Sequence, residues 1–238
     1  MPKKYKKKLD YSFIQGVYPT IELLTYRPQV VQQVFVHPKS DSNTGIQKIR
    51  KLGKEKRIRV EQNEQIFNNL RAPDNTYAIA FFDKYSDTLD ASSDHVLLMQ
   101  PEDMGNLGTT MRTMVGFGYR DLAIIRPAVD VFHPKAVRAS MGSLFQLNTH
   151  YFESFREYVE AYPEHHNYFY TLEKAQSIGE ITTEKPATFV FGSEGGGIPQ
   201  IYLENGTPVT IPFENKTIDS LNLSVAIGIA LYQQYNQS

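Results

Sequence analysis

The sequence predicts an α/β protein in two parts: a small α/β unit followed by a larger domain with a mainly parallel sheet. From His95 onward, short apolar runs alternate with segments of helical apolar spacing, as in sheets whose parallel strands are joined by helices. A polar and acidic stretch, residues 84–94, is predicted to be the linker between the two parts. Residues 1–71 hold 15 Lys and Arg against 6 Asp and Glu, a formal charge of +9, which leaves −10 for the remainder. A split of this size indicates two parts with different roles.

The N-terminal part is expected to begin with a basic flexible arm, residues 1–10, and to continue as an α/β domain over residues 11–83. Residues 30–37 alternate as a strand does, and Ile46 and Ile49 repeat at helical spacing. The basic charge of this part favours a polyanion such as RNA as its partner. The expected elements are a helix at 19–25, a strand at 30–37, a helix at 45–53, and strands at 58–62 and 76–82.

The C-terminal part, residues 95–238, is expected to form the larger domain. Leu107 and Met111 repeat at helical spacing, and in the last predicted helix Val225 and Ile229 share one face. The apolar character of that last helix indicates burial, either by the core or by a partner chain. The expected strands are 96–99, 121–125, 168–172, 188–192 and 208–212, and the expected helices are 106–115, 134–141 and 220–235.

Composition excludes several classes of site. Cysteine is absent, so disulfides and thiolate metal sites are excluded. The basic N-terminus has no apolar core behind it, so it is not a secretory signal, and no apolar run reaches the length of a membrane span. The histidines are isolated, apart from the adjacent His165 and His166, which lack metal-ligand spacing. We therefore expect a cytoplasmic protein without a metal site.

A glycine-rich loop after a predicted strand is the first candidate site. FGSEGGGIP, residues 191–199, contains four glycines together with Glu194. Glycine lets the backbone approach a ligand closely, so a strand that leads into such a loop is typical of nucleotide-type sites. The loop lacks the Lys-Ser/Thr of a phosphate-binding P-loop and the spacing of a dinucleotide fingerprint. Taken alone, it also fits an ordinary tight turn.

Two further segments place polar residues near the starts of predicted helices. GNLGTTMR, residues 105–112, puts Asn106 where it can cap a helix and Arg112 six residues later. The segment 211–233 contains Ser220 and Asn222, either of which can cap the last helix, whose Ser224 and Gly228 form a face of small side chains. Taken singly, each segment fits plain helix initiation.

Together and in this order, the three segments resemble the motifs of the SpoU/TrmH family of RNA 2′-O-methyltransferases. These motifs are NxGxxxR, then G-x-E-x-x-G after a strand, then IP followed by SLNxSVA. PKAVRASMG, residues 134–142, resembles the family's intermediate segment, so the similarity covers about residues 96–232. Residues 14–24 and 30–37 resemble the small substrate-binding domain that many members carry, which is related to ribosomal and kink-turn RNA-binding proteins.

The resemblance implies a SPOUT methyltransferase domain with a deep trefoil knot and a small N-terminal α/β substrate-binding domain. It implies S-adenosyl-L-methionine (SAM) as the cofactor, no metal, and a homodimer with the last helix at the interface. The cofactor-binding residues that it carries over are Gly192, Glu194, Gly197, Ile211 and Leu221.

The implied reaction is methyl transfer from SAM to a ribose 2′-hydroxyl of ribosomal or transfer RNA. The catalytic residues carried over are Arg112, Asn106, Glu194 and Asn222. Arginine has a pKa above about 12, so Arg112 suits stabilisation of a developing alkoxide and a grip on phosphate better than proton removal. We expect Asn106 to orient Arg112 or the ribose, Glu194 to position a hydrogen-bonding partner, and Asn222 to hold the loop or the substrate.

RNA binding is assigned mainly to the N-terminal part, whose small separate domain favours ribosomal RNA. One alternative is a non-catalytic RNA-binding protein on the same fold, which SAM titration would distinguish. A second is a knotted enzyme that methylates a base, which nucleoside analysis of the product would reveal. The candidate RNA-binding residues are Lys48, Arg50, Lys51, Arg57 and Arg138.

Overall fold

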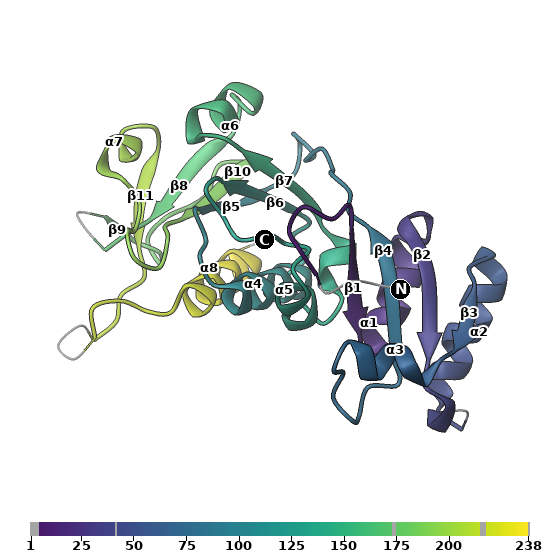
Figure 1. Ribbon diagram of the computed structural model, residues 1–238. Helices are drawn as coiled ribbons and strands as arrows, with labels where there is room; N and C mark the ends of the chain where they lie inside the picture. Colours follow the sequence, from purple (N-terminus) through teal and green to yellow (C-terminus); the bar gives the residue numbers. More distant parts are fainter. Residues whose placement is uncertain (1–4, 41, 173–174, 215–217, 238) are drawn as a thin grey trace. The chain divides into compact units, whose positions relative to one another are not determined.

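The computed structural model describes residues 5–40, 42–172, 175–214 and 218–237, which form two compact units (Figure 1). Unit 1 combines residues 1–85 with residues 130–146, and unit 2 combines residues 86–129 with residues 147–238. Residues 130–146 were predicted to belong to the C-terminal domain, whereas they lie in unit 1. The two units keep the charge split, because unit 1 carries 18 basic and 9 acidic residues and unit 2 carries 7 and 17.

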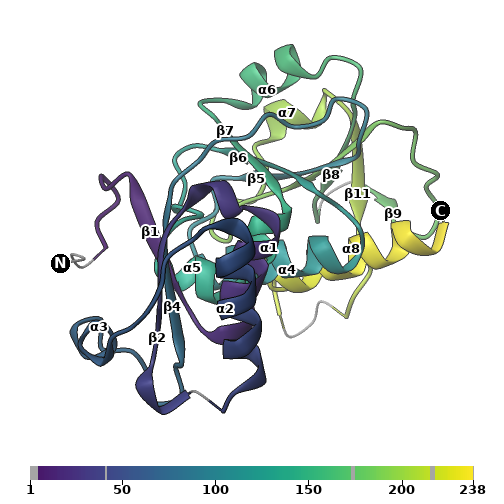
Figure 2. The ribbon, with the colours of Figure 1, turned by 90° about the vertical axis from the view of Figure 1, so that its right-hand side faces the viewer.

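Unit 1 is a four-stranded sheet of order β1-β4-β2-β3 with helices on both faces. The pairs β1–β4 and β2–β4 are antiparallel, and β2–β3 is parallel. Phe13, Phe35 and Phe81 pack against Ile66 and Phe67 of α3 on one face, and α1 packs against α2 on the other (Figure 2). The elements are β1 (Tyr11–Gln15), α1 (Val17–Tyr26), β2 (Val31–Val36), α2 (Thr44–Lys56), β3 (Val60–Gln62), α3 (Glu64–Asn69), β4 (Ala78–Asp83), α5 (Pro134–Ala139) and the 3-10 turns η1 (Pro28–Val30), η2 (Pro38–Ser40) and η3 (Ser143–Gln146).

Residues 130–146 are held in unit 1 by aromatic and ionic contacts. The Phe82 ring lies 5.1 Å from the Phe145 ring, edge to face. Lys84 Nζ lies 2.9 Å from Asp130 Oδ2 and also donates to the Lys7 carbonyl at 2.8 Å. The Tyr5 hydroxyl donates to the same Asp130 carboxylate. The described part of the predicted flexible arm is therefore fastened to unit 1, while residues 1–4 lie outside the described residues.

Unit 2 is a seven-stranded parallel sheet of order β7-β6-β5-β10-β8-β11-β9. Helices α4 and α8 lie side by side on one face, and α6 and α7 lie on the other (Figures 1 and 2). The expected parallel α/β sheet is thus confirmed. The elements are β5 (His95–Met99), α4 (Met104–Gly116), β6 (Asp121–Ile125), β7 (Asn148–Phe152), α6 (Phe155–Ala161), β8 (His166–Tyr170), β9 (Gln176–Ser177), β10 (Ala187–Phe191), α7 (Gln200–Leu203), β11 (Thr207–Thr210) and α8 (Leu223–Gln237).

Both faces of the unit 2 sheet are packed. Phe155 and Tyr158 of α6 lie in one apolar cluster with Leu97. On the other face α8 packs closely against α4. A Cβ added at Gly228 would lie 3.8 Å from the Thr113 side chain. At Gly228, the small-residue face predicted for the last helix therefore lies against α4.

The predicted linker is packed against the amino edge of the unit 2 sheet. Leu89 is buried, and the Asp90 N–H donates to Asp121 Oδ1 at 2.9 Å. At the start of β5, His95 Nε2 lies 2.9 Å from the Asp90 carbonyl, and Nδ1 lies 2.9 Å from the Tyr158 hydroxyl. The His165 ring lies 4.2 Å from the His95 ring. Burial, opposed by the bond to the Asp90 carbonyl, lowers the pKa of the His95 imidazole to about 4.

This buried imidazole should make the protein sensitive to acid. An unfolded chain takes up a proton on His95 below about pH 6.5, whereas the folded chain does so only near pH 4. The free energy of unfolding should therefore fall by up to about 3 kcal/mol as the pH is lowered through this window. Urea unfolding across a pH series measures the effect. His95→Asn should be less stable at neutral pH but should lose less stability in acid, and equal slopes for the two proteins would contradict the assignment.

Candidate functional site

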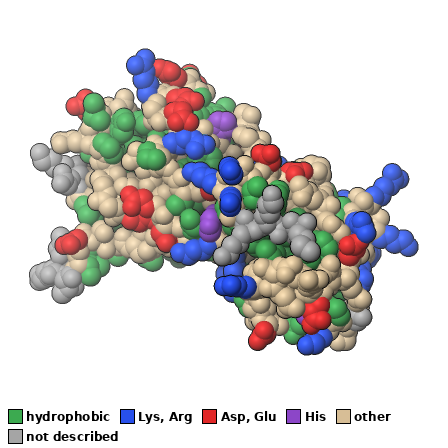
Figure 3. All heavy atoms as spheres, viewed as in Figure 1, with side chains coloured by type: hydrophobic (Ala, Val, Ile, Leu, Met, Phe, Trp, Pro, Cys, Tyr) green, Lys and Arg blue, Asp and Glu red, His purple; other side chains and the backbone are tan. Residues whose placement is uncertain are grey.

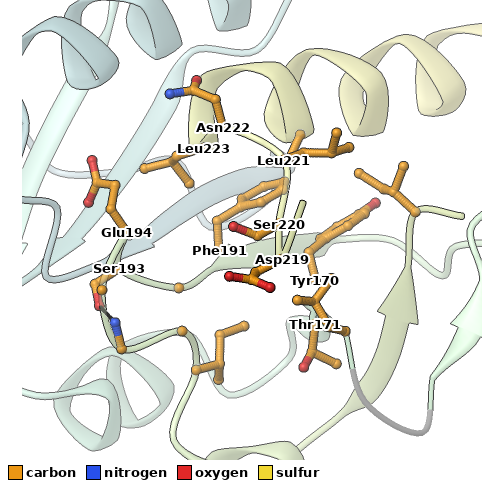
Figure 4. Close-up of a pocket in the computed structure, with 18 of the residues that line it drawn as sticks. Tyr170, Thr171, Phe191, Ser193, Glu194, Asp219, Ser220, Leu221, Asn222 and Leu223 are labelled. Carbon is orange, nitrogen blue, oxygen red and sulfur yellow. Dashed lines mark hydrogen bonds between the residues drawn. The ribbon is translucent and has the colours of Figure 1, made fainter. Parts of the chain in front are cut away.

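A cavity of about 980 Å³ opens at the carboxyl ends of β8, β10 and β11 in unit 2. Its walls come from the glycine-rich loop after β10 and from the segment that leads into α8 (Figure 4). Ligands of open parallel sheets bind at this edge. The lining residues are Tyr170–Leu172, Phe191–Gln200, Leu203, Ile211, Phe213, Asp219–Leu223 and Ala226.

The glycine-rich loop is folded tightly upon itself. The Ser193 N–H donates to the Gly197 carbonyl at 3.2 Å, and the Gly197 N–H donates back at 3.1 Å. A Cβ at Gly192 would lie only 2.3 Å from the Gly197 carbonyl carbon, and Gly197 has φ of +62°. A Cβ at Gly195 would meet no atom within 4 Å. Glycine is therefore required for the close approach at Gly192, while the loop leaves open space above Gly195.

A chain of hydrogen bonds joins the three sequence segments beside this loop. Asn106 Nδ2 donates to Glu194 Oε1 at 3.1 Å, and Asn222 Nδ2 donates to Asn106 Oδ1 at 3.0 Å. The Glu194 carboxylate also accepts from the backbone N–H groups of Glu102 and Asp103, at 3.3 and 3.4 Å. The three segments, far apart in the sequence, thus form one connected site.

The helix caps differ in part from the predicted ones. Asp103, not Asn106, is the N-cap of α4, and its side chain accepts from the Asn106 N–H at 2.8 Å. Asn106 lies within the first turn, so its amide is free to join Glu194 to Asn222. At α8 one of the two predicted capping residues is confirmed, because Asn222 Oδ1 accepts from the Ser224 N–H at 3.0 Å.

The walls of the cavity combine aromatic rings with acidic groups. The Tyr170 and Phe191 rings are stacked, with centroids 4.5 Å apart and an interplanar angle of 12°. Glu194 and Asp219 are acidic, and no Lys or Arg occurs among the described lining residues. Asp219 lies between the Glu194 side of the cavity and Tyr170 (Figure 4). This lining suits a ligand with an aromatic ring and a positive charge, and it does not suit a di- or triphosphate.

SAM fits these residues. Its sulfonium and amino groups are cationic, which matches an acidic lining, and its adenine offers a flat apolar surface. The space above Gly195 allows a ligand to reach the backbone. All five predicted cofactor-binding residues, and Asn222, line this cavity.

Arg112 lies apart from the cavity. It is exposed on α4, it is not among the lining residues, and within the described chain it makes no hydrogen bond or ion pair. Six residues along an α-helix turn the side chain by about 240°, so Arg112 and Asn106 do not share a face. The expected orientation of Arg112 by Asn106 is absent from the described contacts, and the Asn106 amide contacts Glu194 and Asn222 instead.

The candidate RNA-binding residues all belong to unit 1. Lys48, Arg50 and Lys51 are exposed on α2, and Arg57 ends this helix in a left-handed conformation, with φ of 59°. Arg138 is exposed in the last turn of α5. Figure 3 shows Lys and Arg side chains projecting from the edge of unit 1 that carries α2.

Sequence reasoning missed several lining residues. Tyr170 and Thr171 stand at the end of β8, and Asp219 stands before the SLN motif. The end of a predicted parallel strand is the signal that could have identified the first two. For Asp219, the only signal in the sequence was its position directly before the SLN motif.

No group of three or more His, Asp or Glu side chains is arranged to hold a metal ion in the described ranges. Within the same ranges, every helix is too short or too polar to cross a membrane.

Several known RNA methyltransferases are similar to this chain. The 23S rRNA (guanosine(2553)-2′-O)-methyltransferase of Bacillus subtilis is 26% identical over 243 residues, which cover 97% of this chain and 90% of that protein. An uncharacterized tRNA/rRNA methyltransferase of Synechocystis is 32% identical over 145 residues, 60% of this chain, and the chain spans about half (53%) of that relative. The SpoU methyltransferase AviRb of Streptomyces viridochromogenes, in complex with AdoMet, has a TM-score of 0.79 at 21% identity, over 96% of this chain and 90% of that chain. At this identity the last comparison shows a shared fold.

The family assignment rests on the C-terminal part of the chain. The chain matches the model of the SpoU rRNA Methylase family over residues 93–232, which is more than half of its 238 residues. The matched range contains the glycine-rich loop, α4 and the segment before α8, and therefore the whole cavity. The chain belongs to the SpoU rRNA Methylase family.

Proposed function

We propose that this chain transfers a methyl group from SAM to a ribose 2′-hydroxyl of RNA, with ribosomal RNA favoured over transfer RNA. The observation that carries the proposal is the Glu194–Asn106–Asn222 chain at the side of an acidic, aromatic-walled cavity. The 2′-O-methyltransferase of Bacillus subtilis supports the choice of ribose and of ribosomal RNA.

Each site residue has a defined part in the proposed reaction. SAM, when bound, supplies an electrophilic methyl group for in-line attack by the ribose oxygen. The Gly192–Gly197 loop and Leu221 hold the cofactor, and Glu194 keeps the loop joined to α4. Arg112 stabilises the developing alkoxide as a fixed cation, since a guanidinium does not give up its proton at neutral pH, and the proton of the ribose hydroxyl passes to water. Because Arg112 is not among the residues that line the cavity, it contacts the ribose from outside the cavity, on the side where the RNA binds.

Calorimetry with SAM and nucleoside analysis of methylated RNA test this proposal. We expect one SAM site per chain and a 2′-O-methylated nucleotide in a 23S rRNA transcript. Absence of SAM binding would favour a non-catalytic RNA-binding protein. A methylated base would show that the enzyme acts on the base and not on the ribose.

The knotted connection implied by the resemblance belongs to the same proposal. It is supported by the two C-terminal loops that together form the cavity, one after β10 and one before α8. A cofactor wrapped by both loops would be shielded from water on opposite sides.

We also propose that the protein is a homodimer through α8. Val225, Ile229 and Tyr232 remain 50%, 38% and 56% exposed, although Ile227 and Leu231 of the same helix are buried. An apolar stripe of this kind on a helix that already covers a sheet fits a second copy of the chain. Light scattering should give twice the chain mass of 27.2 kDa. Ile229→Asp should halve that mass, and a wild-type value of one chain mass would refute the dimer.

RNA binding should depend on the exposed basic side of α2. Changing Lys48, Lys51 and Lys54 together to Ala removes three exposed cations from unit 1. Affinity for a 23S rRNA transcript should fall, and the slope of log affinity against log salt should decrease by about 0.7–0.9 for each lost phosphate contact. Filter binding across a salt series measures both.

The control for this triple variant is Arg156→Ala in unit 2, which removes one exposed cation paired with Glu160. It should leave affinity and slope unchanged, and equal effects of the two proteins would contradict a role for α2. Deleting residues 1–83 is a poorer test, because it removes Phe82, which packs against Phe145 in the retained segment.

A further inference from the structure

One basic side chain directly follows a strand of the unit 2 sheet at its carboxyl edge. It is Arg126, at the end of β6. This edge is where parallel α/β sheets bind ligands, and unit 2 as a whole is strongly acidic. A cation fixed at this edge can bind an anionic group of a ligand, although the net charge of unit 2 is negative. The residues in the same position after β5, β7, β8, β9, β10 and β11 are Gln100, Glu153, Thr171, Ile178, Gly192 and Ile211.

Arg126 is held from both neighbouring strands. Its backbone N–H donates to the Phe152 carbonyl at 2.9 Å, and Gln100 Nε2 donates to its carbonyl at 3.3 Å. Its guanidinium carbon lies 4.6 Å from the centre of the Tyr151 ring, and its Nε lies 3.1 Å from Glu153 Oε1. The Arg126 side chain is nevertheless 40% exposed. The guanidinium is thus oriented in advance, with terminal N–H groups available on its open side.

The loop that carries Arg126 is joined to the cofactor site. The Val129 N–H donates to the Pro101 carbonyl at 3.1 Å. The next two residues, Glu102 and Asp103, donate their N–H groups to the Glu194 carboxylate. Strands β6, β5 and β10 are successive neighbours, so the ends of β6 and β10 lie about 10 Å apart at a strand spacing of about 4.8 Å. This is the range that one or two nucleotides of a single RNA strand span.

We propose that Arg126 binds a backbone phosphate of the RNA, next to the nucleotide whose ribose is methylated. This inference rests on the proposed RNA methyl transfer and adds a residue that lies outside the three motifs. A guanidinium fork matches two phosphate oxygens in geometry and charge. The Glu153 carboxylate is 79% exposed, so the phosphate can replace it as the partner of Arg126.

The test compares RNA and SAM binding by Arg126→Ala, Arg126→Lys and Glu153→Gln. Filter binding uses a 23S rRNA transcript across a salt series, and calorimetry measures SAM. Arg126→Ala should weaken RNA binding about tenfold and lower the salt slope by about 0.7–0.9, the value of one phosphate contact. Arg126→Lys should keep the slope but recover only part of the affinity. Glu153→Gln should bind RNA as well as the wild type or more tightly.

The control is Lys185→Ala, which removes an exposed cation, paired with Asp94, just before β10 at the opposite edge of the sheet. If Arg126→Ala behaves like this control, the phosphate site is excluded. If Arg126→Ala and Glu153→Gln weaken RNA and SAM binding alike, the pair is structural and the inference is equally overturned. A wild-type protein that binds no SAM and methylates no RNA would instead refute the proposed function itself.

Discussion

Replacing Arg112 by Ala should lower the rate of methyl transfer by at least roughly 10²- to 10³-fold, the usual cost of removing one group that stabilises developing negative charge. SAM affinity should stay within a few-fold of the wild type, because Arg112 is not among the residues that line the cavity. The fold should also tolerate the change, since the side chain is exposed on α4. Single-turnover transfer and calorimetry measure the two quantities on the same protein.

Arg112→Lys serves as the matched control. It retains the positive charge but loses the planar fork, so it should recover part of the rate if Arg112 stabilises an alkoxide and grips phosphate. A collapse of SAM affinity in Arg112→Ala would show that the residue supports the cofactor site instead.

A methyl group added at Gly192 should reduce SAM affinity roughly 10- to 100-fold. The new Cβ would lie 2.3 to 2.6 Å from three backbone atoms of Gly197. Relief requires opening the two hydrogen bonds between Ser193 and Gly197, which shape the loop. Forced overpacking of this kind costs about 1–3 kcal/mol, and each 1.4 kcal/mol corresponds to a tenfold change in affinity. Calorimetry of Gly192→Ala measures the loss.

Gly116→Ala is the control for this substitution, because a Cβ there meets no atom within 4 Å and Gly116 is not a lining residue. Its SAM affinity should equal that of the wild type, and equal losses in both variants would exclude the clash as the cause. Mixing Gly192→Ala chains with Arg112→Ala chains adds a second result. Recovered activity would mean that Arg112 of one copy serves the cavity of the other.

The strands that the sequence missed all lie at sheet edges, and β3 is the one described edge strand of unit 1 that it predicted. β5, β6 and β10 are interior parallel strands, so they appear in the sequence as continuous apolar runs. The missed strands β1, β7 and β9 all lie at sheet edges, where one side lacks a neighbour and polar residues are tolerated. β7, NTHYF, has only two buried residues. Helices α3 and α6 are short, with two buried residues each, and so give little periodic signal.

In the site, residues within short motifs could be predicted from the sequence, whereas contacts between distant segments could not. The motifs identified Gly192, Glu194 and Asn222 because each stands in a compact, recognisable segment. The partners of these residues were not predictable, since the Asn106–Glu194 bond joins positions 88 residues apart. The position of Arg112 outside the cavity likewise depends on how α4 is rotated against α8, which no local pattern encodes.

The hydrogen bond between Asn222 and Asn106 also sets the order in which the cavity is assembled during synthesis, because it requires both residues. Chains emerge from the ribosome N-terminus first, at about 5–20 residues per second. The partners of this bond are 116 residues apart, and Asn222 follows every strand of the unit 2 sheet along the chain. The strands β5 to β11 are therefore complete before the segment that closes the cavity exists. A chain synthesised only as far as residue 220 would have the sheet but would lack Asn222, so the Asn106 side chain would be without this partner and the cavity without this wall.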